Sequence, residues 1–227
     1  MKHDDVARRT MLSAFGAAAA TVALGSTGVA AQAPARAAQP PRHEQDEWMS
    51  RLPGRHRTFI DCATVNGAGE GMLYANNLYV SNRDGYKLPE GDIAVIVGLR
   101  HFATVFAYND AMWAKYGKAM SDLVKFTDPK TKQVPTTNLL NASDYGLTMS
   151  NFGNSIASVV KRGTHFSVCN LATHFFADQI AMMTKGNGEA VYKDLAANLI
   201  PNSHLMAAGV LAVNRSQELG FTLLTAL

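Results

Sequence analysis

The chain has 227 residues, of which 47% are hydrophobic and 17% are charged, proportions that are ordinary for one globular domain. Its formal net charge of +3 and its lack of any stripe of Lys and Arg exclude nucleic acid as an expected partner. Two cysteines, Cys62 and Cys169, can form at most one disulfide, which excludes a disulfide-rich scaffold.

The N-terminus has the pattern of an export signal. Arg8 and Arg9 precede residues 14–31, an apolar stretch made mainly of Ala, Gly, Val and Thr. Paired arginines before a mildly hydrophobic stretch are typical of a twin-arginine signal. We therefore predict a signal peptide over residues 1–37 and a periplasmic or secreted protein that meets the membrane only during export. An uncleaved anchor helix is the alternative.

Residues 38–54 are rich in Pro, Ala, Gln, Arg and acidic side chains, which predicts a flexible linker with a short helical turn at 45–49. Residues 55–227 then alternate between short apolar runs and segments with helical periodicity, so we expect one domain. The expected strands span 56–62, 92–100, 165–169, 203–208 and 221–227. The expected helices span 72–82, 104–118, 154–161, 170–183, 189–199 and 209–219.

Strands that alternate with helices indicate an α/β fold with a mostly parallel sheet, here of about five strands. Right-handed crossovers predict a three-layer, flavodoxin-like arrangement with helices on both faces. Residues 66–71 contain three glycines and predict a tight turn. Residues 125–151 are rich in Pro, Thr, Asn, Asp and Lys, and predict a loop insertion that climbs to the carboxyl edge of the sheet as a lid.

The strand at 165–169 ends at Cys169 and is followed at once by a helix, for which Asn170 is the expected N-cap. Apolar residues that include Phe175 and Met183 recur at helical spacing and are expected on its buried face. The unpaired N–H groups and the positive dipole end of a helix N-terminus favour an anion. Because a thiolate is an anion, Cys169 is predicted to be reactive, with an inert core residue as the alternative.

Ligands of open parallel sheets bind outside the carboxyl ends of the strands, where the strand order reverses. If the first three strands lie in the order 2-1-3, Cys62, His101 and Cys169 converge on one cleft. The candidate catalytic residues are Cys169, His101 and Arg100. The candidate ligand-binding residues follow the strand ends or lie in the next helix: Cys62, Asn66, Asn170 and His174.

Three interpretations of this cleft stay open. In the first, Cys169 is a nucleophile or persulfide carrier that His101 and Arg100 support with positive charge. In the second, both cysteines form a soft-metal site for copper or zinc with His101 and His174, although no CxxC or HxxxH pair supports it. In the third, Cys62 and Cys169 form a disulfide, which an exported location permits.

The glycine-rich segment 66–71 does not indicate a nucleotide cofactor. Its spacing is G-x-G-x-G rather than G-x-G-x-x-G, and Arg100 rather than an acidic residue ends the second strand. The sequence also lacks a P-loop and the motifs G-x-S-x-G and H-E-x-x-H. We expect no cofactor and, in the first interpretation, no resident metal.

Three segments, residues 93–116, 165–176 and 205–221, resemble the DsrE/DsrF-like family of small α/β proteins from sulfur metabolism. The most specific match is Val168 followed by Cys169 at the end of a strand. In sulfur-relay members of this family a cysteine at this position carries a persulfide, and members are commonly oligomeric. The resemblance therefore implies that Cys169 carries sulfur and that the protein forms a homo-oligomer.

These observations predict an exported DsrE-like protein that binds or relays a sulfur species at Cys169, and that is sulfurtransferase-like if it is active. The expected partner is a small sulfur-containing ligand or the thiol of a partner protein. One alternative is a non-catalytic periplasmic module that binds a metal or a small ligand in the same cleft. Another is an oligomeric accessory subunit without chemistry of its own.

Overall fold

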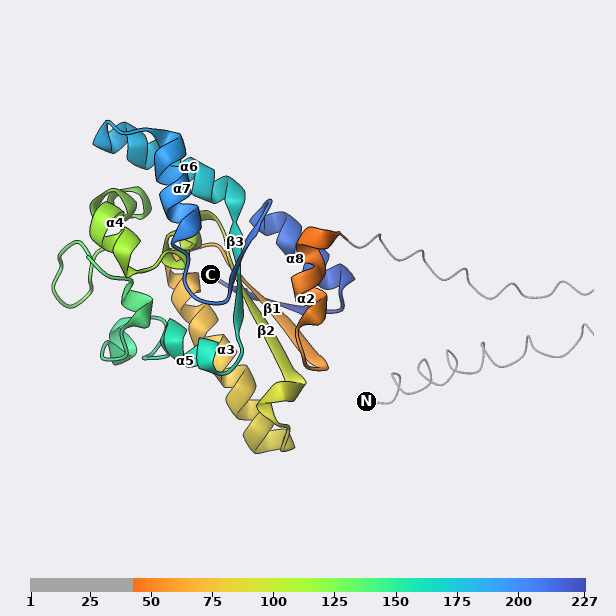
Figure 1. The fold of residues 1–227 in the computed structure, drawn as a ribbon. Helices are drawn as coiled ribbons and strands as arrows, with labels where there is room; N and C mark the ends of the chain where they lie inside the picture. Colours follow the sequence, from red (N-terminus) through yellow and green to blue (C-terminus); the bar gives the residue numbers. More distant parts are fainter. Residues whose placement is uncertain (1–42) are drawn as a thin grey trace, which may run out of the picture. The chain divides into compact units, whose positions relative to one another are not determined.

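The computed structural model describes residues 43–227, and Figure 1 draws them as a coloured ribbon. The predicted signal peptide, residues 1–37, and the first part of the predicted linker lie outside the described residues. Within residues 43–227, no helix has both the length and the apolar character needed to cross a membrane.

A five-stranded sheet forms the centre of the domain, and every pair of neighbouring strands in it is parallel. The strand order is β4-β3-β2-β1-β5, so β4 and β5 are the edge strands. Each strand forms at a predicted apolar run, and β3 spans the predicted residues. The strands are β1 (His56–Cys62), β2 (Ile93–Leu99), β3 (His165–Cys169), β4 (Ser203–Met206) and β5 (Thr222–Ala226).

Helices connect the strands, and polar side chains cap several of them. At the start of α4, for example, the side chain of Asn109 accepts a hydrogen bond from the backbone N–H of Met112. The α-helices are α2 (Glu47–Arg51), α3 (Val65–Tyr86), α4 (Asp110–Val124), α5 (Ile156–Lys161), α6 (Asn170–Thr184), α7 (Gly188–Ala197) and α8 (Gly209–Glu218). The 3-10 helices are η1 (Glu44–Asp46), η2 (Glu90–Asp92), η3 (His101–Ala107), η4 (Leu139–Asn141) and η5 (Gly146–Thr148).

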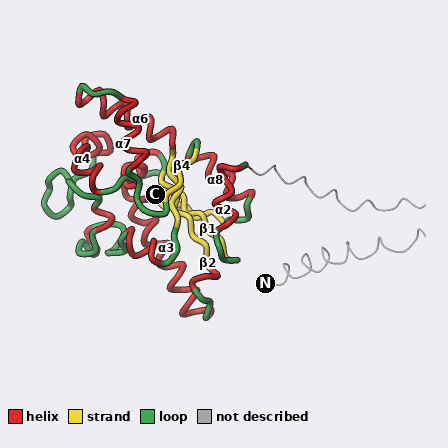
Figure 2. The backbone as a smooth tube through the Cα atoms, in the orientation of Figure 1, coloured by secondary structure: helices red, strands yellow, loops and turns green. Residues whose placement is uncertain are grey.

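The direction of the crossovers explains how the helices divide between the two faces of the sheet. Strands β1 to β4 follow one another across the sheet, so right-handed connections place α3 to α7 on one face. The connection from β4 to β5 runs back across the sheet, and α8 lies on the opposite face with α2 (Figures 1 and 2). These layers confirm the predicted α/β, three-layer, flavodoxin-like arrangement. The expected order 2-1-3 is wrong, because β2 lies between β1 and β3.

Strand β2 is buried along its whole length, because helices cover both of its faces. On the face of α3 to α7 it contributes Val95 and Val97 to the larger core. On the face of α2 and α8 it contributes Ala94 and Ile96 to a smaller core. Burial on both faces explains why this strand is a continuous apolar run rather than an alternating one.

The glycine-rich segment 66–71 is the start of α3 rather than the predicted tight turn. The helix begins before these glycines, and the side chain of Thr64 caps it by accepting a hydrogen bond from the backbone N–H of Gly67. A Cβ at Gly71 would lie 2.6 Å from Cys62 Sγ. Glycine therefore lets the first turns of α3 pack closely against β1.

The region between β2 and β3 differs from the prediction at its start and agrees with it later. The helix expected over 104–118 is displaced: η3 comes first, and α4 begins only at Asp110. In the described residues, 125–151 contains only short 3-10 turns, as expected of a loop insertion. Its end lies beside α3, since Ser150 Oγ donates a hydrogen bond to the backbone oxygen of Asn66 at 2.7 Å.

The expected flexible linker, residues 38–54, contains ordered helical structure in its second half. Residues 44–51 form η1 and α2, and the side chain of Met49 is fully buried against the sheet. Trp48 stacks on His204 of β4, with ring centroids 3.8 Å apart and planes only 6° apart. The apolar contacts of Trp48 and Met49 therefore attach this segment to the domain.

We predict that acidification weakens this attachment. Burial lowers the pKa of His204 to about 4, and the neighbouring His165 contributes a smaller lowering effect. Because the unfolded chain binds a proton nearer pH 6.5, the stabilisation is complete above that pH and is lost as the pH falls toward 4. Because His204 is partly exposed to solvent, we expect a discounted loss of about 1–2 kcal/mol.

Urea unfolding at pH 7.5 and at pH 4.5 measures this loss, and His204→Gln is the matched variant. The variant should lose less stability than the parent protein between these two pH values. Equal losses in the two proteins would contradict the assignment to His204.

Candidate functional site

A cavity of about 490 Å³ opens at the carboxyl ends of β2, β3 and β4. The helix after β3 and the helix after β4 lie on opposite faces of the sheet, so the connections diverge at this point. Such a switch point is where open parallel sheets bind ligands. It lies between β3 and β4 and not, as expected, beside β1. The cavity is lined by Arg100, His101, Phe102, Cys169, Leu171, Ala172, Phe175, Phe176, Ala208, Gly209 and Val210.

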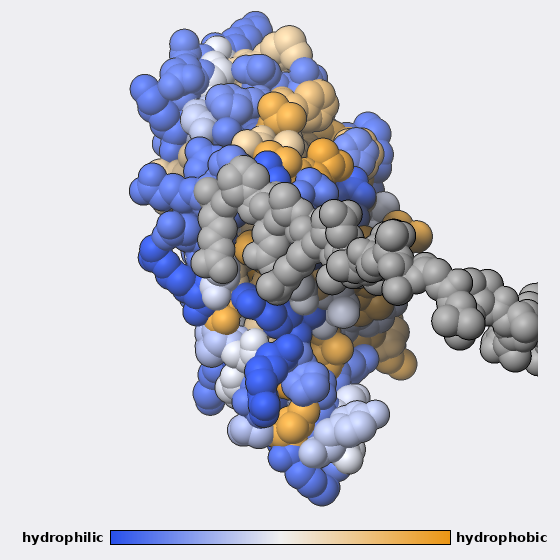
Figure 3. Space-filling model, turned by 90° about the vertical axis from the view of Figure 1, so that its right-hand side faces the viewer, coloured by the Kyte–Doolittle hydropathy of each residue, from blue (hydrophilic) through white to orange (hydrophobic). Residues whose placement is uncertain are grey.

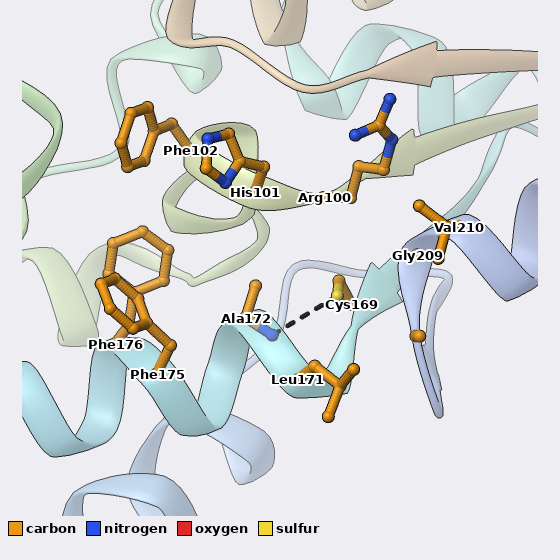
Figure 4. Close-up of a pocket in the computed structure, with 11 residues that line it drawn as sticks. Arg100, His101, Phe102, Cys169, Leu171, Ala172, Phe175, Phe176, Gly209 and Val210 are labelled. Carbon is orange, nitrogen blue, oxygen red and sulfur yellow. Dashed lines mark hydrogen bonds between the residues drawn. The ribbon is translucent and has the colours of Figure 1, made fainter.

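Cys169 lies at the base of the cavity and is itself the N-cap of α6. Its Sγ accepts a hydrogen bond from the backbone N–H of Ala172 at 3.4 Å, which Figure 4 marks with a dashed line. The predicted cap, Asn170, is instead the first residue of the helix. A sulfur atom that accepts a hydrogen bond from the first turn of a helix lies at the end of the helix dipole that stabilises negative charge.

Arg100 lines the cavity, but its charge is already paired. Its Nε and Nη2 donate to the two carboxylate oxygens of Asp61 at 2.7 and 2.8 Å. These hydrogen bonds raise the pKa of Arg100. In Figure 4 the guanidinium points away from Cys169, so the residue forms part of the wall and makes no direct contact with the sulfur.

His101 comes directly after Arg100 and lies at the exposed rim of the cavity. Its backbone has a φ of 52°, in the left-handed region that residues other than glycine rarely adopt. Its ring stacks on Phe102 with centroids 4.1 Å apart. Backbone strain of this kind concentrates at functional sites, and here it holds an imidazole at the cavity entrance.

The start of α8 forms the wall opposite His101. Its N-cap, Ala208, supplies no side-chain hydrogen bond, so the first N–H groups of this helix lack a capping partner. A Cβ at Gly209 would lie 2.4 Å from Arg100 Cβ and 3.2 Å from Cys169 Cβ. Glycine therefore brings this helix N-terminus against the sulfur-bearing residue. Two helix N-termini, those of α6 and α8, meet at the cavity.

The rim of the cavity is apolar and exposed. Figure 3 shows hydrophobic residues gathered in the upper half of the face on the side of α2 and α8. Phe175 is 49% exposed, so the prediction that it lies on the buried face of α6 is wrong, as it is for Met183. The exposed apolar residues of the rim are Phe102, Leu171, Phe175 and Val210.

The three candidate catalytic residues, Cys169, His101 and Arg100, all line this cavity, because β2 and β3 are neighbours. Of the residues we expected to bind ligand, Cys62 is fully buried and faces Gly71 of α3. None of the lining residues belongs to the insertion 125–151, so within the described chain the expected lid does not cover this cavity.

The remaining predicted ligand-binding residues have structural contacts elsewhere. Asn66 Nδ2 donates to the backbone oxygen of Leu227 at 3.0 Å. Asn170 Oδ1 accepts a hydrogen bond from the hydroxyl of Tyr192 at 3.0 Å. His174 stacks on the same tyrosine, with centroids 3.8 Å apart and planes 8° apart. These three side chains therefore fix the starts of α3 and α6 and the packing of α6 on α7.

The disulfide and the four-residue metal site are both contradicted. Cys62 and Cys169 are free thiols in the structure. Burial raises the pKa of the Cys62 thiol, and the charge of Asp61 adds to this effect. Within residues 43–227, no three His, Cys, Asp or Glu side chains gather closely enough to hold a metal ion. Cys62 lies in the core on the α3 face, away from Cys169.

Sequence reasoning missed Gly209 and the apolar rim. The signal for Gly209 was its position directly after the two small residues that follow β4, at a helix start without a polar cap. The signal for the rim was the pair of adjacent aromatics, Phe175 and Phe176, because neighbouring residues on a helix point about 100° apart, so one of them can lie at the edge of the apolar face. Only the second of the two is buried.

The fold and the cavity together define a class: an α/β domain with a doubly covered parallel sheet and a helix-capping thiol at its switch point. No protein-family model, no curated protein and no solved structure matches the chain. The arrangement of the site is therefore the basis for any assignment of function.

We predict that iodoacetamide modifies Cys169 in the folded protein at least about ten-fold faster than Cys62. Cys169 opens to a cavity and accepts a helix N–H, whereas Cys62 is fully buried and has a raised pKa. Mass spectrometry of the two cysteine peptides after short labelling measures the ratio, and labelling in urea supplies the control. Equal rates in the folded protein would contradict the assignment.

Proposed function

We propose that this chain is an exported, DsrE-like protein that binds or relays a sulfur species at Cys169. The observation that supports this most is the placement of the Cys169 sulfur at the base of a cavity, where it accepts a hydrogen bond from the N-terminus of α6. The start of α8 adds a second set of N–H groups beside the same residue. Both features place backbone N–H donors next to the sulfur that would carry the transferred atom.

The proposed reaction is a transfer between thiols. The Cys169 thiolate attacks the outer sulfur of a donor persulfide, and a new S–S bond forms to Cys169. The S–S bond of the donor breaks, and the donor sulfur leaves as a thiolate with the electron pair. The transferred sulfur keeps its proton or exchanges it with water, and an acceptor thiolate later removes it by the same steps. No external oxidant or reductant is consumed.

His101 and Arg100 have supporting roles in this proposal. Both residues line the cavity that contains Cys169. We propose that the imidazole at the rim donates a proton to the departing thiolate. The ion pair of Arg100 with Asp61 fixes the guanidinium at the wall of the cavity and satisfies the buried carboxylate. The donor is a small sulfur compound or a protein thiol, and we propose that the protein acts as a homo-oligomer.

Native mass spectrometry of the protein recovered from the periplasm tests this function. We expect one additional sulfur atom that maps to Cys169, that reductant removes, and that Cys169→Ser abolishes. Cys62→Ser is the matched control and should retain the sulfur, because Cys62 is buried in the core. Unmodified thiols after incubation with a polysulfide donor, or sulfur that persists in Cys169→Ser, would contradict the proposal.

The export step has a separate test. The adjacent arginines that suggest the twin-arginine route are Arg8 and Arg9. Replacing both by lysine should leave the protein in the cytoplasm, because this route depends on the arginine pair. Cell fractionation with an antibody against the domain measures the distribution. Normal export of the double variant would contradict the assignment of this route.

A second candidate function is a non-catalytic module that binds a small apolar ligand in the same cavity. The observation that favours it is the lining of the cavity, since most of the side chains are aliphatic or aromatic. Binding of such a ligand should survive Cys169→Ser and should weaken when Phe175 is replaced by Asp. The sulfur-relay function predicts instead that Cys169→Ser has the larger effect and Phe175→Asp the smaller one, so these two variants separate the candidates.

A further inference from the structure

A second cluster of side chains with metal-binding chemistry lies on the other face of the sheet from α3, under the short helix α2. It consists of His165 on β3, His204 and Met206 on β4, and Trp48 on α2. The two strands are neighbours, and residues 204 and 206 point to the same face because they are two positions apart. This cluster has no part in the sulfur chemistry proposed for the cavity.

The two histidines present nitrogen atoms to each other. His165 Nδ1 lies 3.0 Å from His204 Nε2, and the two rings are nearly parallel. Two imidazole nitrogens that each lie about 2 Å from one metal ion can have this separation. Imidazole binds a metal through an unprotonated ring nitrogen, and each of the two rings has one nitrogen that faces the other histidine.

Met206 adds a soft donor to the pair. The side chain of Met206 lies in the smaller core, and Trp48 packs against that core. Its Sδ accepts a hydrogen bond from Trp48 Nε1 at 3.4 Å. A thioether sulfur has a second lone pair, so this hydrogen bond orients the sulfur without using all of its donor capacity. The indole also stacks on His204 and fixes that ring.

An independent observation in the same place is the hydroxyl of Ser167. Ser167 lies between His165 and Cys169 on the same face of β3 and is the register partner of His204. The residue is almost completely buried, and in the described part of the chain its Oγ has no hydrogen-bond partner. A buried polar atom without a partner indicates a missing ligand or water molecule beside it.

We propose that His165, His204 and Met206 bind a single Cu(I) ion beside the indole of Trp48. Two imidazoles and one thioether form a donor set that favours this soft monovalent cation over Zn²⁺, which is rarely bound through methionine. In the neutral pair, one ring donates the proton of the hydrogen bond between His165 Nδ1 and His204 Nε2. When the ion binds, this proton moves through water to the other nitrogen of the same ring, so that each ring carries one proton on the nitrogen that does not face the ion. Binding changes no oxidation state and involves no thiol.

Titration of the full chain with Cu(I), in competition with a chromogenic Cu(I) chelator, tests this proposal. The titration uses Cys169→Ser as the parent protein, because a thiol also binds Cu(I). We expect one Cu(I) per chain and quenching of the Trp48 fluorescence, measured in a Trp113→Phe background. Met206→Leu keeps an apolar side chain in the core and should weaken binding at least ten-fold, as should His204→Gln.

His174→Gln is the matched control, because His174 is also a ring-stacked histidine but lies on α6. It should bind Cu(I) as tightly as the parent protein. Circular dichroism verifies that each variant is folded, and Met206→Leu alone decides the result if His204→Gln unfolds. The proposal is overturned if the parent protein binds no Cu(I), or if Met206→Leu binds it as tightly as the parent. Because the parent protein lacks Cys169, failure here leaves the sulfur-relay proposal unaffected.

Discussion

Replacing Asp61 by Ala is expected to lower the free energy of unfolding by about 2–4 kcal/mol. The side chain of Asp61 is 10% exposed and that of Arg100 is 28% exposed, so the substitution leaves a largely covered guanidinium without its partner. Two hydrogen bonds of 2.7 and 2.8 Å are lost with it. We also expect Arg100 to turn toward the cavity, which changes the labelling rate of Cys169.

Asp92→Ala is the matched control for this experiment. Asp92 also pairs with an arginine, Arg55, but that arginine is 82% exposed and the contact is longer, at 3.4 Å. Exposed ion pairs of this kind contribute less than about 1 kcal/mol. Urea unfolding of the two variants measures the difference. Equal losses for Asp61→Ala and Asp92→Ala would show that the Asp61–Arg100 pair contributes no more than a surface pair does.

Replacing Gly209 by Ala is expected to destabilise the domain by about 1–3 kcal/mol and to slow the modification of Cys169. The added Cβ would lie 2.4 Å from Arg100 Cβ, a distance that real Cβ contacts do not reach. Either α8 moves outward or the Arg100 backbone shifts, and both movements change the wall of the cavity. Thermal unfolding and the rate of iodoacetamide labelling measure the two effects.

Gly85→Ala separates the local clash from the general effect of a glycine substitution. Gly85 is also helical, and a Cβ at that position would have no neighbouring atom within 4 Å. Alanine there should be neutral or stabilising by about 0.5–1 kcal/mol, because it reduces the entropy of the unfolded chain. A neutral effect of Gly209→Ala on both measurements would contradict the close packing of α8 against the sheet.

Local signals in the sequence determined the elements of this fold. The apolar run at 93–97 predicted a strand that is buried on both faces, and β2 has this burial. The residues of β3 match the prediction, because a short segment with Phe166 and Val168 ends where a helix begins. The α/β class and the three layers followed from the alternation of strands and helices. All of these inferences depend on neighbours in the chain.

Local signals were weaker where two structures compete for the same residues. The glycines of 66–71 have low helix propensity, yet they are helical in α3 because a helix there can pack directly on β1. Similarly, Trp48 and Met49 lie in a segment whose composition predicts a linker, but they find apolar partners on the sheet. In both places tertiary packing overrides the local preference.

Only the tertiary structure decided which residues meet. The strand order depends on the direction in which each crossover steps, and no local pattern in the sequence records that direction. The order places the switch point between β3 and β4, so Cys169 lies beside Gly209 while Cys62 is enclosed under α3. The pairing of Asp61 with Arg100 and of His165 with His204 arises in the same way, because each pair joins neighbouring strands or their ends from segments far apart in the chain.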